Sequence, residues 1–281
     1  MVNGKWAYSL DASRESDTNV LAQYIDRSVA VRGMHSARLG LKYGTLADEC
    51  IDIFAPSEEG RAPFVAFFHG GWWKANNRIP RAFLAAEYLK RGFGFASIGY
   101  PLAPEHSIST IFESARNAIS WLHRNASRFG LNPSRIVLAG NSAGGHLATM
   151  IGAEDSLAAA GLPASSVVGI VALSGIYDLG LLAETFVEEW LPLDQEIIRS
   201  CSPIHHLPAQ STPLLLAVGD AEPNGFKEQM LSYACAVKKA GRSVISEETA
   251  GHSHFSIIGE LSRPRARPFE FSVARLTGEE S

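Results

Sequence analysis

Cysteine is scarce in this sequence, with three residues in 281: Cys50, Cys201 and Cys235. They lie far apart, are odd in number and form no Cys-x-x-Cys pair, which argues against a disulfide framework and against a cysteine-based metal site. Because an unpaired cysteine behaves as a small apolar residue, we expect three semi-buried thiols.

The sequence also lacks a long apolar run and a surplus of positive charge. No stretch approaches the roughly eighteen apolar residues that a membrane-spanning helix needs. Lys and Arg total 25 against 29 Asp and Glu, a net charge of −4, so the composition points to neither nucleic acid nor a membrane as a partner. Residues 1–5 lack the basic-then-apolar pattern of a secretory signal, and we therefore expect a cytoplasmic protein.

The sequence does contain a hydrophobic fraction of 46%, arranged as alternating strand and helix patterns. Because parallel strands need long crossovers, this alternation predicts a mostly parallel sheet with helices on both faces. The expected strands are 37–43, 49–54, 63–68, 94–100, 135–139, 167–173, 213–218 and 243–247. The expected helices are 18–31, 80–91, 110–128, 143–151, 226–239 and 255–261.

No repeat or low-complexity linker divides the chain, so we expect one domain over residues 1–281. Residues 1–36 are a candidate cap over the site. Residues 176–212 contain no strand pattern and suit a cap-like excursion over one end of the sheet. For the tail, 262–281, we expect a solvated end, with the alternative that residues 269–276 dock as a short helix.

The strongest local motif is Gly-Asn-Ser-Ala-Gly-Gly at 140–145, where a strand pattern ends and a helix pattern begins. A serine hydroxyl needs exposure and a neighbouring base to act as a nucleophile. A sharp strand-to-helix turn provides the exposure, and flanking glycines relieve the crowding. We therefore predict Ser142 as a nucleophile, with the first N–H groups of the new helix directed at an oxyanion.

A second motif, His-Gly-Gly-Trp-Trp at 69–73, directly follows a buried strand pattern. Acyl transfer places negative charge on a carbonyl oxygen, which fixed backbone N–H groups stabilise. We expect the N–H groups of Gly71, Trp72 and Ala143 to form this oxyanion hole. His69 then has a structural role, and core packing explains the tryptophans as well as substrate contact does.

The two motifs resemble those of the kynurenine formamidase group of α/β-hydrolases, which is close to the hormone-sensitive-lipase-like esterases. Four further segments match that group: 41–44 leading into 51–56, 100–104, 174–179 and 226–229. The resemblance runs from about Leu41 to Glu260. It implies the α/β-hydrolase fold, with a mostly parallel eight-stranded sheet, helices on both faces and a small cap, and it implies a Ser–acid–His triad.

Two carboxylates are candidates for the acid, since Asp220 and Glu222 both follow the strand pattern at 213–218. A residue directly after a strand is still tied to the sheet, whereas one two positions further can turn toward the site. The resemblance aligns its Gly-x-x-acid pattern with Glu222, which we favour, with Asp220 as the alternative. Glutamate is an accepted triad acid.

Two histidines, His252 and His254, are candidates for the base. Members of the kynurenine formamidase group place the catalytic histidine directly before an aromatic residue. The resemblance therefore selects His254, which precedes Phe255. His252 is then expected to be partly exposed or to contact the site indirectly, and His146 to pack beneath the elbow. No histidine set has metal-ligand spacing, and we expect neither a metal nor an organic cofactor.

These residues together predict a serine hydrolase that cleaves a small ester or amide. An aryl formamidase and a carboxylesterase are both compatible with the resemblance. The alternative from another class is a small-molecule-binding protein that uses the fold without chemistry. Such proteins lose a triad member, whereas a serine, an acid and a histidine are all present here. The expected partner is a small-molecule substrate, and a homodimer is compatible with the sequence.

Overall fold

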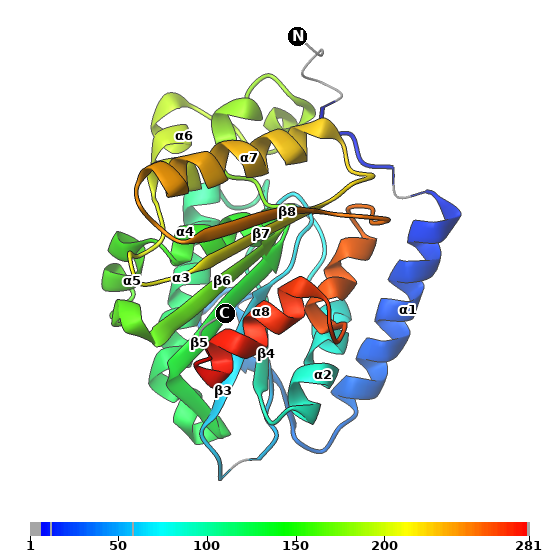
Figure 1. Cartoon of the computed structure of the whole chain (residues 1–281), viewed down its shortest axis with the longest axis vertical. Coiled ribbons are helices and arrows are strands. Elements are labelled where there is room, and N and C mark those ends of the chain that lie inside the picture. The colour runs from blue at the N-terminus through cyan, green and yellow to red at the C-terminus, as the bar shows by residue number, and fades with distance from the viewer. Residues whose placement is uncertain (1–6, 12, 58, 280–281) are drawn as a thin grey trace.

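The computed structural model describes residues 7–11, 13–57 and 59–279, and is built around one eight-stranded sheet (Figure 1). Its strands follow the order β1-β2-β4-β3-β5-β6-β7-β8. β2 is antiparallel to both of its neighbours, and the other strand pairs are parallel. The strands are β1 (Ala37–Lys42), β2 (Cys50–Phe54), β3 (Ala62–Phe68), β4 (Gly94–Ile98), β5 (Leu131–Asn141), β6 (Val167–Leu173), β7 (Leu214–Gly219) and β8 (Val244–Thr249).

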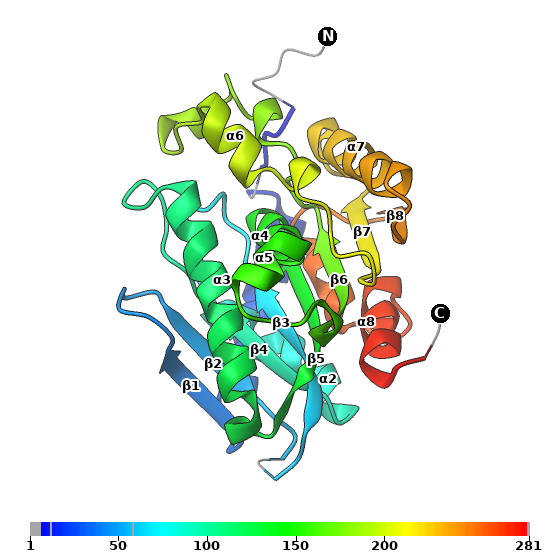
Figure 2. The ribbon, with the colours of Figure 1, turned by 90° about the vertical axis from the view of Figure 1, so that its left-hand side faces the viewer.

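Helices cover both faces of the sheet (Figures 1 and 2). One apolar core lies under α1 (Glu15–Arg32), the 3-10 helix η2 (Ile79–Leu84), α2 (Ala85–Lys90), the 3-10 helix η8 (Ser256–Ser262) and α8 (Arg267–Thr277). The opposite core lies under α3 (Ile108–Asn125), α4 (Ala143–Ile151), α5 (Glu154–Ala159), α6 (Gln195–Cys201) and α7 (Asn224–Lys239). The prediction of a mostly parallel sheet with helices on both faces is confirmed.

The central strands are largely apolar because both of their faces are covered. Every residue of β4 and β7 is buried, whereas the edge strands β1 and β8 are partly exposed. On α3 only one face is covered, so the apolar residues recur at helical spacing. Ile111, Ala115 and Ile119 lie on that face and are completely buried.

Residues 176–212 form no strand, as predicted, and contain several short helices. The helices are η5 (Leu179–Leu181), η6 (Phe186–Glu189), α6 and η7 (Pro203–His205). This segment reaches the loop that follows β3: the Trp190 indole donates a hydrogen bond to the Trp72 carbonyl at 3.3 Å, and the Phe186 and Trp72 rings are 5.4 Å apart.

The expectation of a solvated C-terminal end is wrong for most of the tail, where the alternative of a docked helix holds. α8 buries Phe269 and Leu276 completely or nearly so, on the face of the sheet visible in Figure 1. The arginines before this helix made the tail polar in composition, although the helix itself carries an apolar stripe. Cys235 is a second correction, because its side chain is exposed while Cys50 and Cys201 are buried.

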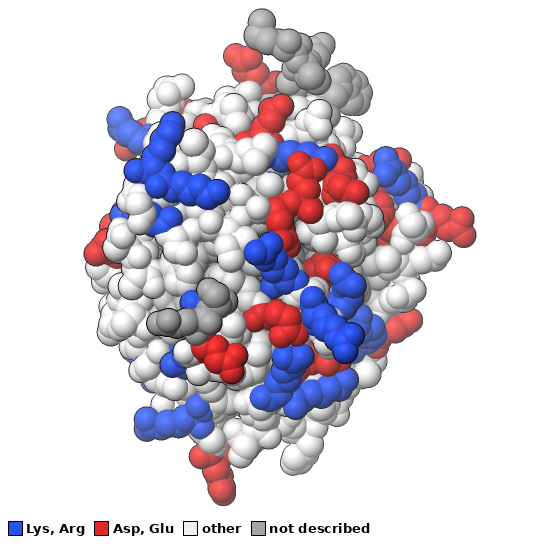
Figure 3. Space-filling view, viewed as in Figure 1, with Lys and Arg blue, Asp and Glu red and all other residues white. Residues whose placement is uncertain are grey.

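The charged side chains form no large patch of one sign on the face shown in Figure 3, where acidic and basic groups are interspersed. Several of them pair, as in Arg91–Glu270 and Lys227–Glu248. None of the helices in the described ranges has the length and apolarity to cross a membrane. Residues 1–6, on which part of the cytoplasmic expectation rests, lie outside the described residues, as do 280 and 281.

The docked C-terminal helix leads to a stability prediction. Replacing Phe269 by alanine should lower the free energy of unfolding by about 3–5 kcal/mol, because a buried aromatic ring is lost and a cavity remains. Urea unfolding followed by circular dichroism measures the change. The control is Leu231→Ala on α7, where the side chain is 56% exposed and little change is expected. Equal, small effects of both substitutions would contradict the docking of α8.

Candidate active site

Ser142 lies at the turn between β5 and α4, with backbone angles φ 55° and ψ −123°. The turn is closed so tightly that a Cβ atom on Gly140 would lie 2.1 Å from the carbonyl oxygen of Gly144. A Cβ atom on Gly144 would lie 2.0 Å from the carbonyl oxygen of Phe68, at the end of β3. Only glycine fits at either position. The predicted strand–turn–helix elbow is therefore present.

The same turn holds the loop that follows β3. Gly70 donates its N–H to the Asn141 side-chain oxygen at 3.2 Å, which ties the loop directly to the residue before Ser142. Gly71 has a φ of 127°, and Trp72 and Trp73 both have a φ of 54°. Two consecutive non-glycine residues in this region are costly, so the surrounding structure must hold them there.

His69 is part of that support. Its Nδ1–H donates to the Gly70 carbonyl at 2.9 Å, and its ring stacks on Tyr100 at 4.2 Å. The Tyr100 hydroxyl in turn donates to the His69 carbonyl at 2.5 Å. Burial lowers the pKa of His69 to about 3, so this imidazole is neutral. These contacts agree with the structural role predicted for His69.

The loop and the elbow present backbone donors to one cavity. In the described part of the chain, the N–H groups of Gly71 and Trp72 have no hydrogen-bond acceptor. Ala143 is the first residue of α4, where N–H groups lack an acceptor within the helix. Gly71, Trp72 and Ser142 line a cavity of about 270 Å³.

His254 lines the same cavity and contacts a buried carboxylate. Its Nδ1 lies 2.6 Å from Glu222 Oε2. The other oxygen of Glu222 accepts hydrogen bonds from the Ser174 hydroxyl at 2.6 Å and from the Gly219 N–H at 2.7 Å. These donors fix the carboxylate at the ends of β6 and β7. Because a carboxylate accepts, His254 carries its proton on Nδ1, and Nε2 is left as the acceptor.

Among the described residues, Asp220, the alternative acid, forms no hydrogen bond or ion pair with a histidine ring. It is exposed and accepts hydrogen bonds from the N–H groups of Gly251 at 2.8 Å and His252 at 3.2 Å. The bond from Gly251 in particular holds the pKa of Asp220 below its usual range. Asp220 therefore fixes the loop that carries His254.

The remaining candidate histidines lie away from the cavity. His252 contacts Ser256 Oγ at 3.2 Å and Glu260 at 3.3 Å. His146 is buried beneath the elbow, as predicted, and its Nε2–H donates to the Cys201 carbonyl at 2.7 Å. Within the described ranges, no three His, Cys, Asp or Glu side chains are grouped as metal ligands would be.

The N-terminal segment also reaches this region. Leu10 lines the cavity of Ser142, and the Tyr8 ring lies edge-on to Trp72 at 6.3 Å. The amide of Gln229 on α7 donates to the Tyr8 hydroxyl at 3.1 Å and accepts the N–H of Tyr177 at 2.8 Å. Most of α1 packs on η2, and of the described residues before β1 only Leu10 lines this cavity, although Asp17 of α1 accepts a hydrogen bond from the Ser253 hydroxyl beside His254.

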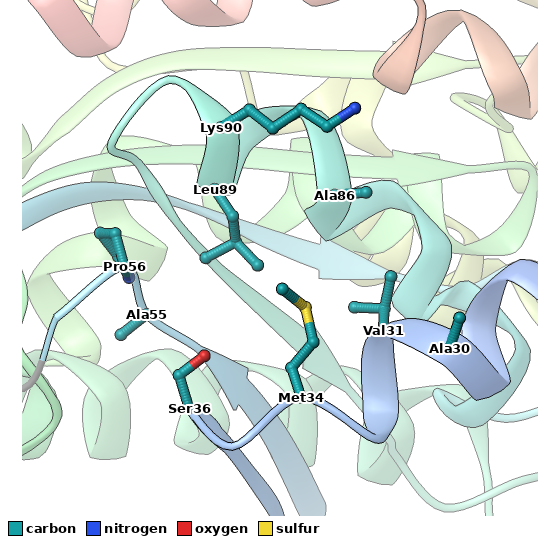
Figure 4. Close-up of a pocket in the computed structure, with 9 residues that line it drawn as sticks. All are labelled: Ala30, Val31, Met34, Ser36, Ala55, Pro56, Ala86, Leu89 and Lys90. Carbon is teal, nitrogen blue, oxygen red and sulfur yellow. The ribbon is translucent and has the colours of Figure 1, made fainter.

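A larger cavity of about 510 Å³ lies between the end of α1, the start of β1 and α2 (Figure 4). Its lining is apolar except for Ser36 and Lys90. Met34, Val31 and Leu89 converge there, and none of the catalytic candidates contributes to it. Size alone therefore does not identify the candidate active site, which is the cavity that combines Ser142 with His254.

Sequence reasoning missed several residues of the site. Asn141 lies inside the elbow motif, and Ser174 and Tyr100 lie inside segments that match the resembling group, but no pattern assigned them a role. Arg81 also lines the cavity and carried no sequence signal, because it lies in an ordinary helix pattern.

Comparison with known proteins agrees with this fold. A family model described as BD-FAE matches residues 51–230. Kynurenine formamidase of Danio rerio is 29% identical over 236 residues, which cover 82% of this chain and 78% of that protein. Esterase LipQ of Mycobacterium tuberculosis (strain ATCC 25618 / H37Rv) is 26% identical, over 69% of this chain and 50% of the esterase. The crystal structure of a candidate thioesterase from Silicibacter sp. TM1040 has a TM-score of 0.81 at 26% identity, covering 99% of this chain and 100% of that one.

The sheet order and these relatives define the class. The protein is an α/β-hydrolase, an enzyme of the kind that hydrolyses ester or amide bonds. Within that class, the chain belongs to the BD-FAE family, whose model covers more than half of it. The predicted resemblance to kynurenine formamidases and esterases is confirmed.

The buried histidines predict how stability depends on pH. Burial lowers the pKa of His146 from 6.5 to about 4, and that of His69 to about 3. Below pH 6.5 the unfolded chain therefore binds more protons than the folded one. The free energy of unfolding should fall by about 1.4 kcal/mol per pH unit for each histidine as the pH drops toward 4.

Urea unfolding at a series of pH values between 4.5 and 7 measures this slope. His146→Gln keeps an amide donor for the Cys201 carbonyl and should reduce the slope by about 1.4 kcal/mol per pH unit. The matched control is His35→Gln, since His35 is exposed and should leave the slope unchanged. An unchanged slope in His146→Gln would show that the lowered pKa of His146 does not contribute to the pH dependence of stability.

Proposed function

We propose that this hydrolase works through an acyl-enzyme on Ser142, with His254 as general base and Glu222 as the acid that orients it. The observation that carries the proposal is the shared cavity of Ser142 and His254, with Glu222 bonded to the far side of the imidazole at 2.6 Å. With Nδ1 donating to Glu222, Nε2 is the nitrogen available to remove the hydroxyl proton.

The reaction then has two steps. His254 takes the Ser142 proton while Oγ attacks the substrate carbonyl carbon, and the leaving group departs with that proton. Water next gives a proton to His254 and attacks the acyl-enzyme, and Ser142 regains its proton as the acid product leaves. Glu222 holds the Nδ1–H tautomer and stabilises the positive imidazolium that forms in each step.

The N–H groups of Gly71, Trp72 and Ala143 are the proposed oxyanion hole. Those of Gly71 and Trp72 have no other acceptor within the described residues, and the α4 N-terminus adds its positive dipole end. Because the strained loop is bonded to Asn141 beside the nucleophile, these donors are positioned before substrate arrives. Such preorganisation is a major source of rate enhancement in acyl transfer.

The proposed substrate is a small ester or an aryl formamide. The cavity volume of about 270 Å³ supports a small substrate, and the Danio rerio relative supports the formamide type. Trp72 forms part of the cavity wall and offers an aromatic surface to a flat substrate. A binding protein without chemistry is not favoured, because the serine, the acid and the histidine are all retained.

Removing the nucleophile tests the mechanism. Ser142→Ala should lower kcat/KM for both p-nitrophenyl acetate and N-formylkynurenine by about 10³-fold or more, because no acyl-enzyme can form. Initial rates with the two substrates measure the loss and show which bond is preferred. Turnover that is unaffected by Ser142→Ala, or no turnover of either substrate by the wild type, would contradict the proposal.

Replacing the two carboxylates separately tests the acid. Glu222→Gln should lower kcat by about 10³- to 10⁴-fold, because the amide no longer holds the required imidazole tautomer. Asp220→Asn is the matched control: it removes the same charge two residues earlier in the chain, but it leaves Glu222 in contact with His254. Equal and mild losses from both variants would show that neither is the triad acid.

A further inference from the structure

Arg81 is a buried cation in the wall of the candidate active site. It lies in η2, directly after the loop that carries the proposed oxyanion donors, and is 5% exposed. It lines the cavity together with Ser142 and His254. Within the described residues its guanidinium forms no ion pair, and its Nε has no hydrogen-bond partner.

Three other arginines near the sheet are paired with a carboxylate. Arg32 and Arg78 both pair with the buried carboxylate of Asp52, and Arg263 pairs with Glu260. An uncompensated buried charge is costly, and a guanidinium cannot escape that cost by losing its proton. Burial lowers the pKa of Arg81, which reflects this cost.

The groups that surround Arg81 provide no negative charge. The ionisable side chains that act on Arg81 are the phenols of Tyr24 and Tyr100. Burial raises the pKa of Tyr24 to about 12 and that of Tyr100 higher still, so both phenols are neutral. They donate to the carbonyls of Ser256 and His69. No aspartate or glutamate of the described ranges lines the cavity.

We propose that Arg81 binds a carboxylate group of the substrate, so that this enzyme prefers small anionic esters or amides over neutral ones. The planar guanidinium matches a carboxylate in geometry and charge, and a bound carboxylate would supply its missing partner. The cavity of about 270 Å³ limits the substrate to a small molecule. This inference rests on the proposed function, because it assigns the substrate class of that same cavity.

Matched pairs of esters test the preference. p-Nitrophenyl valerate and the mono-p-nitrophenyl ester of glutaric acid differ by a carboxylate on the acyl side. Phenyl acetate and 3-carboxyphenyl acetate differ by one on the leaving-group side. The wild type should prefer the charged member of at least one pair, and that pair identifies the side that faces Arg81.

Substitutions then assign the preference to Arg81. Arg81→Met should raise KM for the preferred charged ester by about tenfold or more and leave kinetics with its neutral partner nearly unchanged. Arg81→Lys should retain part of the preference, because the charge remains. The control is Lys74→Met, which removes an exposed cation that lies over the Trp190 ring and should not alter the preference.

A binding measurement separates this inference from the serine mechanism. Benzoate should raise the Tm of Ser142→Ala but not that of the Ser142→Ala, Arg81→Met double variant, and neither measurement requires turnover. Arg81→Met should itself hold or raise Tm, since replacing an uncompensated buried charge by an apolar side chain of similar length is commonly neutral or stabilising.

Two results would overturn the inference. One is a wild type that shows no preference for the charged member of either pair. The other is an Arg81→Met variant that keeps the preference, even with a lower Tm, because Arg81 would then serve the fold alone. Activity abolished by Ser142→Ala together with either result would leave the proposed function standing and remove only the role of Arg81.

Discussion

Close backbone contact between the end of β3 and the start of α4 organises the candidate active site. Gly144 lies against the carbonyl oxygen of Phe68, and Gly140 lies against that of Gly144, so any side chain at these positions would separate the elements. The hydrogen bond from Gly70 to Asn141 completes the contact. Because these elements touch, Ser142 and the N–H groups of the loop after β3 face one small cavity. Acyl-transfer chemistry needs both within reach of the same carbonyl group.

A second network fixes the imidazole from the opposite side. Ser174 and Gly219 hold Glu222 at the ends of two neighbouring strands, and Glu222 holds His254. Asp220 acts on the same loop through its backbone. The two nearby carboxylates therefore have different roles. The buried Glu222 contacts the His254 ring, and the exposed Asp220 stabilises the loop that carries His254. A shared strand end explains why both lie within three residues.

Buried ionisable groups in this protein are handled in two ways. The two fully buried histidines, His69 and His146, become neutral and serve as hydrogen-bond donors to carbonyl groups. Arginine does not have that option. Arg32 and Arg78 meet a carboxylate, whereas Arg81 meets only neutral phenols and the cavity. This imbalance, at a wall shared with Ser142, is the basis for assigning it a ligand of opposite charge.

The sequence by itself determined the sheet, the elbow and the loop after β3. Those features depend on short-range rules: apolar runs for strands covered on both faces, and glycine where the backbone of Gly140 or Gly144 meets a carbonyl oxygen. Residues alone left Asp220 and Glu222 both open, and the resemblance favoured Glu222. Only the tertiary structure decided which carboxylate contacts His254 and placed Phe269 in the core. It also showed that Arg81 has no charged partner among the described residues. Each of these depends on where segments far apart in sequence lie in space, and no local pattern carries that information.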